Sequence, residues 1–325
     1  MAAHRHQAQS GNAGFFLVLV ASTFLMGSSF ISGKILISAG FPPMLLVGWR
    51  FFVAALATLP LVLLDSGSPR AALMPAGMKL RSWALVIVIG LAQTTAVMGL
   101  LFLAMRTISA STAAILLFTN PIWVAVLGRL FLGESLHKAR LAGLFLGIVG
   151  VTLAIGLGAS AVSGPGALMG ELIGLASALC WAGATIVNKR AGLPMGSWSL
   201  SFWQMLIGSL VLLVIAYGLG NRWSAHTTNA QWGWFLWLAI PASTGSFGLW
   251  FAALNKGGAT RTSGYLFLAP LFTVLLSFFI LHTTLSWLQA LGGILIGLAL
   301  WLVNRELPAR SEHERMNEVA AEGEP

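Results

Sequence analysis

Residues 15–37 read FFLVLVASTFLMGSSFISGKILI, an apolar run that is broken by a single charge, Lys34. An α-helix rises about 1.5 Å per residue, so a run of about 20 residues crosses the roughly 30 Å hydrocarbon layer of a bilayer. The apolar core of a signal peptide is shorter, about 7–15 residues. We therefore expect this run to be a retained membrane-spanning helix.

Similar runs follow along the chain and are joined by short connections. None of them alternates apolar and polar residues, as a β-barrel strand would. The fold class predicted from the sequence is an all-α membrane protein with ten transmembrane helices. These helices are expected near residues 15–37, 43–64, 82–104, 109–131, 139–158, 169–190, 197–218, 232–254, 260–281 and 285–304.

The composition supports a lipid environment. Of 325 residues, 57% are hydrophobic and only 8% are charged, whereas soluble domains carry about 25% charged residues. The formal net charge is +9, which in a soluble protein would suggest nucleic acid. Here the charges lie between the apolar runs, so we read them as orientation signals and expect no nucleic-acid partner.

The basic residues alternate from one connection to the next. With the N-terminus in the cytoplasm, nearly all Lys and Arg outside the spans fall on the inner side, and the outer connections keep only Arg106 and Arg222. This alternation predicts ten spans with both termini cytoplasmic. We expect residues 1–14 to be a cytoplasmic N-terminal tail and the polar residues 305–325 to be a disordered cytoplasmic C-terminal tail.

The two halves of the chain resemble each other. At an offset of 155 residues, Ser22 and Lys34 align with Ser177 and Lys189, and at an offset of 149 residues Pro121 aligns with Pro270. Between these, Trp49-Arg50 aligns with Trp203-Gln204. We predict two five-helix repeats, at residues 15–158 and 169–304. Because five is odd, the second repeat enters the membrane from the opposite side, and inverted repeats recur in secondary transporters.

Two prolines mark the predicted substrate site. Pro121 and Pro270 fall inside the fourth and ninth predicted spans, and each removes a backbone N–H and frees a carbonyl. Matched interruptions in two repeats point to a substrate site, although a proline can also kink a helix merely for packing. Asn120, beside Pro121, is the strongest single candidate for a ligand contact.

Charged residues inside the predicted spans are few. Lys34 and Arg50 lie near the outer ends of two adjacent spans, where they either contact the substrate or a gate, or extend to the lipid headgroups. All nine acidic residues lie in loops, at span ends or in the tail, so the sequence shows no buried carboxylate relay for protons.

Uncharged polar and aromatic residues complete the candidate site: Gln93, Asn188, Trp181, Trp250 and Tyr265. Amide, hydroxyl and aromatic groups together suit small amphipathic or zwitterionic solutes. The alternative is structural, because polar side chains also bond across membrane helices and tryptophans also gather at the membrane interface.

Other kinds of site find no support in the sequence. Cys180 is the only cysteine, and no Cys/His cluster suggests zinc, so we expect no metal and no cofactor. No nucleotide-binding loop or catalytic constellation occurs, so we expect no enzymatic activity. Glycines 143, 147 and 150, and glycines 292, 293 and 297, are read as helix-packing positions.

Several short motifs together resemble the EamA-type members of the drug/metabolite transporter superfamily. They are Met26-Gly27-Ser28-Ser29-Phe30, Trp49-Arg50-Phe51, Asn120-Pro121, Gly133-Glu134-Ser135-Leu136 and Ala178-Leu179-Cys180-Trp181-Ala182. The chain departs from the family pattern at Met26, where a Trp is usual. It departs again at His282-Thr283-Thr284, where many members have a Gly-Glu-Arg-like turn.

This resemblance implies a ten-helix carrier of the bacterial inner membrane with both termini cytoplasmic. Its central cavity would be lined by spans 1, 3, 4, 6, 8 and 9. It also implies export of amino acids or related metabolites by alternating access. A multidrug or cationic efflux carrier and a non-transporting membrane protein are the alternatives. The expected partners are a small solute and the bilayer, and the oligomeric state is open, with a monomer allowed.

Overall fold

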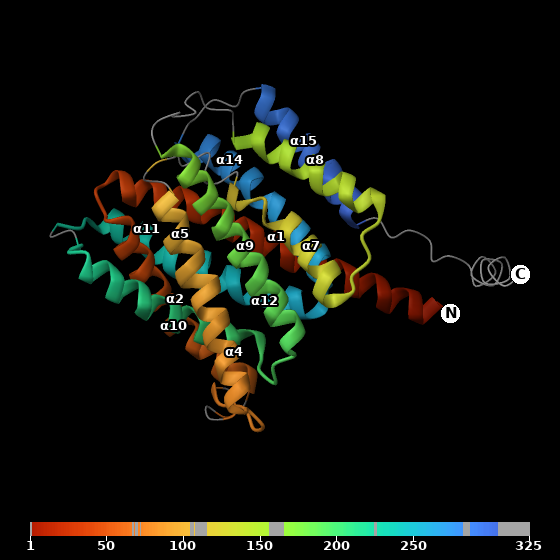
Figure 1. Ribbon diagram of the computed structural model, residues 1–325, viewed down its shortest axis with the longest axis horizontal. Coiled ribbons are helices and arrows are strands. Elements are labelled where there is room, and N and C mark those ends of the chain that lie inside the picture. The colour runs from red at the N-terminus through yellow and green to blue at the C-terminus, as the bar shows by residue number, and fades with distance from the viewer. Residues whose placement is uncertain are drawn as a thin grey trace, which may run out of the picture.

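The computed structural model describes residues 2–66, 68, 71, 73–104, 107, 116–155, 166–223, 226–281 and 287–304. Within these ranges the chain is helical and contains no strand (Figure 1). The elements are α1 (Ala2–Ser38), α2 (Pro43–Ser66), α4 (Leu80–Gly90), η1 (Leu91–Ala96), α5 (Val97–Ala104), α7 (Asn120–Leu132), α8 (Lys138–Ile155), α9 (Ala167–Ala191), α10 (Ser197–Gly218), α11 (Asn229–Ala239), η2 (Ile240–Gly245), α12 (Ser246–Lys256), α13 (Ala259–Gly264), η3 (Tyr265–Phe267), α14 (Leu268–Leu281) and α15 (Trp287–Asn304).

Seven helical stretches among the described residues are long and apolar enough to cross a membrane. They are Gly14–Ser38, Pro43–Leu64, Leu80–Leu101, Leu168–Ala191, Ser197–Gly218, Asn229–Lys256 and Ala259–Ile280. Asn120–Leu132 and Ala290–Val303 are shorter apolar helices. The prediction of an all-helical, multi-pass membrane protein is confirmed, and the count of ten spans stays a prediction. The C-terminal tail, 305–325, lies outside the described residues.

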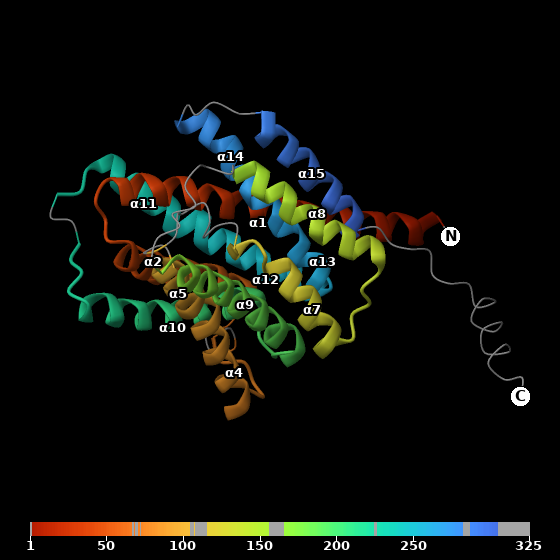
Figure 2. The same ribbon diagram turned by 45° about the horizontal axis from the view of Figure 1, so that its top comes forward.

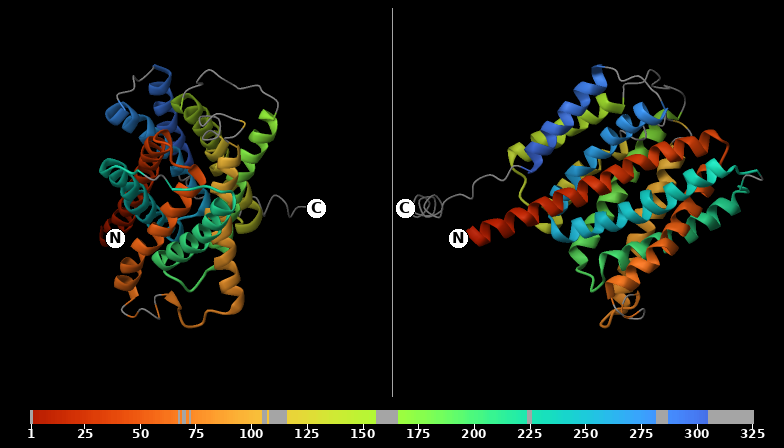
Figure 3. Two further views of the ribbon diagram at one scale, coloured as in Figure 1. Left: turned by 90° about the vertical axis from the view of Figure 1, so that its left-hand side faces the viewer. Right: turned by 180° about the vertical axis from the view of Figure 1, so that it is seen from behind.

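The helices pack in two groups. The first surrounds α1, which contacts α11, α12 and α14; the second surrounds α9, which contacts α4, α5 and α7. Two further pairs, α2 with α10 and α8 with α15, pack along their lengths, and α8 and α15 lie side by side at one edge (Figures 1 and 2). The first described turn of α1 and the last turn of α15 lie at the same end of the bundle (Figure 3).

Small residues allow the close pairs. A Cβ at Gly143 of α8 would lie 2.9 Å from the Ala299 carbonyl oxygen of α15, and one at Gly150 would lie 2.9 Å from the Ile296 nitrogen. On α10, a Cβ at Gly208 would lie 2.3 Å from the Thr94 Cβ. The packing role predicted for Gly143 and Gly150 is therefore confirmed: helices approach where no side chain separates their backbones.

Candidate transport site

Two continuous helices each contain one π-helical turn. The first helix is formed by α4, η1 and α5, and the second by α11, η2 and α12. The turns Leu91–Ala96 and Ile240–Gly245 have equal length and start 149 positions apart, the offset that aligns Pro121 with Pro270. A π-turn widens the helix and leaves backbone groups without their usual partner, and such turns are frequent at functional sites.

A serine from a neighbouring helix bonds the carbonyl that directly follows each π-turn. The Ser22 hydroxyl of α1 donates to the Ser246 carbonyl at 2.8 Å, and the Ser177 hydroxyl of α9 donates to the Val97 carbonyl at 2.8 Å. Ser22 and Ser177 are the residues that the sequence alignment of the two halves pairs. The two contacts are thus the same contact made once in each half of the chain.

Two further contacts to the π-turns are duplicated. In one half, Arg50 Nε donates to Ser243 Oγ at 2.7 Å; in the other, Thr94 Oγ1 donates to Gln204 Oε1 at 2.5 Å. The duplicates differ chemically, because a cation occupies one position and a neutral amide the other. Thr244 and Thr95 likewise donate to the carbonyls of Ala54 and Gly208, at 2.7 and 3.1 Å.

One face of α9 carries a line of candidate residues. Ala178, Trp181 and Asn188 are three and seven residues apart, a spacing that places them on one side of a helix over about 15 Å. The Asn120 amide nitrogen of α7 donates to the Ala178 carbonyl at 3.2 Å. The Trp181 ring lies 6.2 Å from the Trp250 ring of α12. Residues from α7, α9 and α12 therefore meet along this face.

These buried side chains keep unpaired polar atoms among the described residues. Asn120 is fully buried, yet its Oδ1 has no partner. The same holds for one or more polar atoms of Gln93, Trp181, Asn188 and Trp250, all less than 8% exposed. An unpaired buried polar atom costs about 1–3 kcal/mol, so each of these atoms is available to bond a solute or water.

The matched prolines lie where their helices begin again. Pro121 is in the first turn of α7, after a turn at residues 118–119. Pro270 is the third residue of α14, and α14 begins directly after the 3₁₀ turn Tyr265–Phe267. Both prolines are buried. Proline is tolerated in the first turn because the N–H it lacks has no intrahelical partner there.

The structure brings some predicted residues together and separates others. Asn120 bonds α9 at Ala178, and the Trp181 ring of α9 lies beside the Trp250 ring of α12. Asn188 lies further along α9, and Gln93 lies in η1, which packs on α9. Arg50 instead bonds η2 from α2. Tyr265 packs against the Phe15 and Phe16 rings at 6.1 and 6.0 Å. The Lys34 side chain lies outside the described residues.

Three hydroxyls on α13 were missing from the sequence prediction. Thr260, Thr262 and Ser263 are fully buried, and their hydroxyl oxygens have no partner among the described residues. The dense run of hydroxyl residues after Gly257-Gly258 was the available signal. These hydroxyls extend the polar region toward the end of the bundle where α1 begins.

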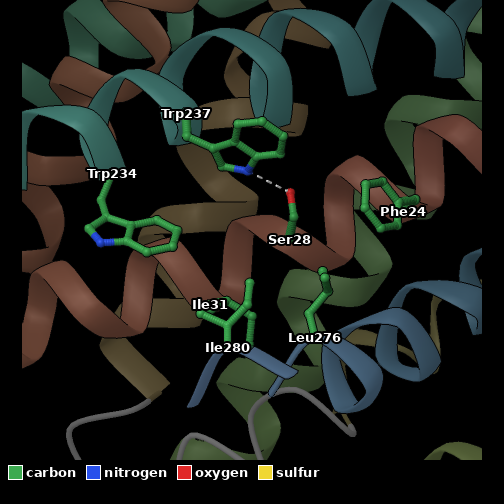
Figure 4. Close-up of a pocket in the computed structure, with 7 residues that line it drawn as sticks. All are labelled: Phe24, Ser28, Ile31, Trp234, Trp237, Leu276 and Ile280. Atoms are coloured by element: carbon green, nitrogen blue, oxygen red, sulfur yellow. Dashed lines mark hydrogen bonds between the residues drawn. The ribbon is translucent and has the colours of Figure 1, made fainter. Parts of the chain in front are cut away.

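An apolar groove of about 270 Å³ lies elsewhere, between α1, α11 and α14 (Figure 4). Trp237 Nε1 donates to Ser28 Oγ at 3.0 Å across it. Phe24, Ser28 and Ile31 line it from α1. Phe30, whose ring lies 5.9 Å from the Phe118 ring, faces the turn before α7 instead. The groove therefore opens on a different face of α1 from the face toward the polar cluster.

The fold and the cluster define a class: a multi-pass helical membrane protein with a polar interior. Residues 12–156 and 168–305 each match the EamA-like transporter family. The chain belongs to this family, whose members are transporters and not enzymes. Transport of a small solute within a lipid environment follows from that membership.

Individual relatives agree with the family match. The chain is 27% identical to an uncharacterized transporter of Archaeoglobus fulgidus, over 90% of this chain and 97% of the relative. It is 28% identical to a WAT1-related chloroplastic protein of Arabidopsis thaliana, over 91% and 71%. A crystal structure with 18% identity shares the fold, with a TM-score of 0.75 over 88% of this chain and 96% of that one.

Proposed function

We propose that this protein is a secondary transporter that exports amino acids or related small metabolites across a bacterial inner membrane by alternating access. In this proposal ten spans form two inverted repeats, at residues 15–158 and 169–304, and both termini face the cytoplasm. The single observation that carries it is the duplicated architecture of the π-turns. Each turn is contacted at equivalent positions by the neighbouring helices.

Duplicated contacts support alternation for a physical reason. If the two halves can adopt each other's conformation, then a site between them opens to one side and then to the other. The helix pairs come in corresponding sets: α1 with α14 and α12 in one group, α9 with α7 and α5 in the other. With a shared set of pairings, the halves can exchange conformations by exchanging contacts of the same kind.

The unpaired polar atoms of the candidate site favour a solute that carries several hydrogen-bond acceptors. The unpaired nitrogen donors include Gln93 Nε2, Trp181 Nε1, Asn188 Nδ2 and Trp250 Nε1, whereas the unpaired amide oxygens are those of Gln93 and Asn120. No acidic residue lies within a predicted span interior. Donors pair with carboxylate oxygens, and a solute with a net positive charge would find no buried countercharge for it. This census favours carboxylate-bearing solutes over the cationic efflux alternative.

A solute panel tests the proposal. The purified protein in liposomes should release labelled amino acids faster than protein-free liposomes, while cationic dyes leave at the protein-free rate. Dye release without amino-acid release would replace this proposal with the multidrug alternative.

A further inference from the structure

Two charged side chains hold the short connection between α12 and α13. Only Gly257 and Gly258 separate these helices. Glu134 follows α7, and its carboxylate accepts the Ala259 N–H at 2.6 Å and the Thr260 N–H at 3.0 Å. From the end of α9, Lys189 Nζ donates to the carbonyls of Leu254, at 2.8 Å, and Gly257. One helix end receives an anion and the other a cation, as their dipoles favour.

Two glycines allow the Glu134 carboxylate to approach the connection closely. Gly133 ends α7 with φ +68°, in the left-handed region, and turns the chain so that Glu134 reaches α13. A Cβ at Gly258 would lie 3.2 Å from the Glu134 carboxylate. The connection and the carboxylate are thus shaped to meet closely, and a side chain at residue 258 would press against the carboxylate.

The contacts join the two helix groups. α7 and α9 belong to the group around α9, whereas α12 packs on α1; α13, which follows α12, packs mainly on α7. A Cβ at Gly257 would lie 2.7 Å from the Phe15 ring, so the connection lies at the end where α1 enters the bundle. Behind it lie the unpaired hydroxyls of Thr260, Thr262 and Ser263.

We infer that Glu134 and Lys189 form a gate that closes the polar site on the cytoplasmic side and must release in every transport cycle. The inference rests on the proposed function and its topology. It assigns these residues a positioning role: they hold the α12–α13 connection against α7 and α9. While they hold, the two groups cannot separate at this end.

The other half of the sequence lacks the carboxylate of this gate. The offsets of the repeat pair Lys189 with Lys34 but pair Glu134 with Thr283, which has no carboxylate. The sequence therefore supplies a carboxylate at this position in one half only. This asymmetry favours a resting state that is closed to the cytoplasm.

Accessibility of a buried reporter tests the gate. Cys180 is the only cysteine, so a Cys180→Ala background accepts a single reporter, Thr262→Cys, which the connection covers. Inside-out vesicles would be exposed to a membrane-impermeant maleimide. Adding Glu134→Gln or Lys189→Met should raise the labelling rate about tenfold, because each loses charge-assisted hydrogen bonds.

Matched substitutions control for charge and folding. Glu171→Gln and Arg190→Met change exposed residues on α9 and should leave the rate unchanged, and Glu134→Asp should restore part of the protection. An exposed reporter, Lys256→Cys, should label equally in all backgrounds and so verifies folding. Unchanged Thr262→Cys labelling in Glu134→Gln and Lys189→Met would overturn the gate, and amino-acid release by those variants would leave the proposed function standing.

Discussion

Asn120 is the residue on which the proposed site depends most. Its amide nitrogen joins α7 to α9, while its oxygen is buried without a partner. Asn120→Ala removes both groups, and the loss of one or two buried hydrogen bonds should reduce flux about five- to fiftyfold. Membrane abundance should not change. Release of labelled amino acids from proteoliposomes, with abundance by immunoblot, measures this.

The control has similar local chemistry. The Asn221 amide also donates to a backbone carbonyl, that of Ala216, at 3.1 Å, but it lies beyond the end of α10. Asn221→Ala should retain full flux. Equal flux in Asn120→Ala and wild type would remove Asn120 from the site.

The sequence predicted residue types better than residue positions. A buried amide beside a proline identified Asn120, because polar groups in a membrane span are costly and so are informative. The partners were not predictable, since the Ala178 carbonyl and the Trp250 ring come from distant helices. Arg50 illustrates the limit: its burial against Ser243 follows from packing of α2 on η2, which no local pattern encodes.

At the scale of the element, we expect the two serines that bond the carbonyls after the π-turns to stabilise the fold. Removing the Ser177 hydroxyl removes its hydrogen bond to the Val97 carbonyl, and Ser22→Ala does the same for the Ser246 carbonyl. Each substitution should lower the free energy of unfolding in detergent by about 0.5–1.5 kcal/mol. Ser29→Ala is the control, because the Ser29 hydroxyl bonds only the Met26 carbonyl of its own helix. A loss as large in the control would contradict a special role for the π-turn serines.

Close packing of α10 on η1 gives a second element-scale prediction. Gly208→Ala would place a Cβ 2.3 Å from the Thr94 Cβ, whereas Gly218 of the same helix has nothing within 4 Å. Overpacking typically costs about 1–3 kcal/mol. Thermal unfolding should therefore shift down for Gly208→Ala and remain near wild type for Gly218→Ala. A similar stability for both variants would show that α10 moves away from η1 without cost.

The elements themselves were largely predictable, and their irregularities were not. Apolar runs of about 20 residues place the helices, since the bilayer fixes their length. The hydroxyls that bond the carbonyls directly after the π-turns Leu91–Ala96 and Ile240–Gly245 come from distant parts of the chain. The second of these two sequences contains a proline and the first does not, so the two π-turns share no local motif from which the pair could have been predicted.

At the scale of the whole molecule, the orientation in the bilayer is open to direct measurement. Arg190 and Arg222 are exposed and lie at opposite ends of the α9–α10 pair. The distribution of basic residues places Arg190 inside. In intact cells of the Cys180→Ala background, an impermeant maleimide should label Arg222→Cys, and Arg190→Cys only after permeabilisation. The reverse pattern would invert the proposed topology and move the Glu134–Lys189 gate to the outer side.

Solute counterflow tests the central claim most directly. Proteoliposomes loaded with an unlabelled amino acid should transiently accumulate the labelled form above its external concentration, with saturable kinetics, because one alternating site serves both directions. The accumulation should be lost in Asn120→Ala. If no amino acid in the panel enters faster than it enters protein-free liposomes, the assignment of an amino-acid carrier is wrong.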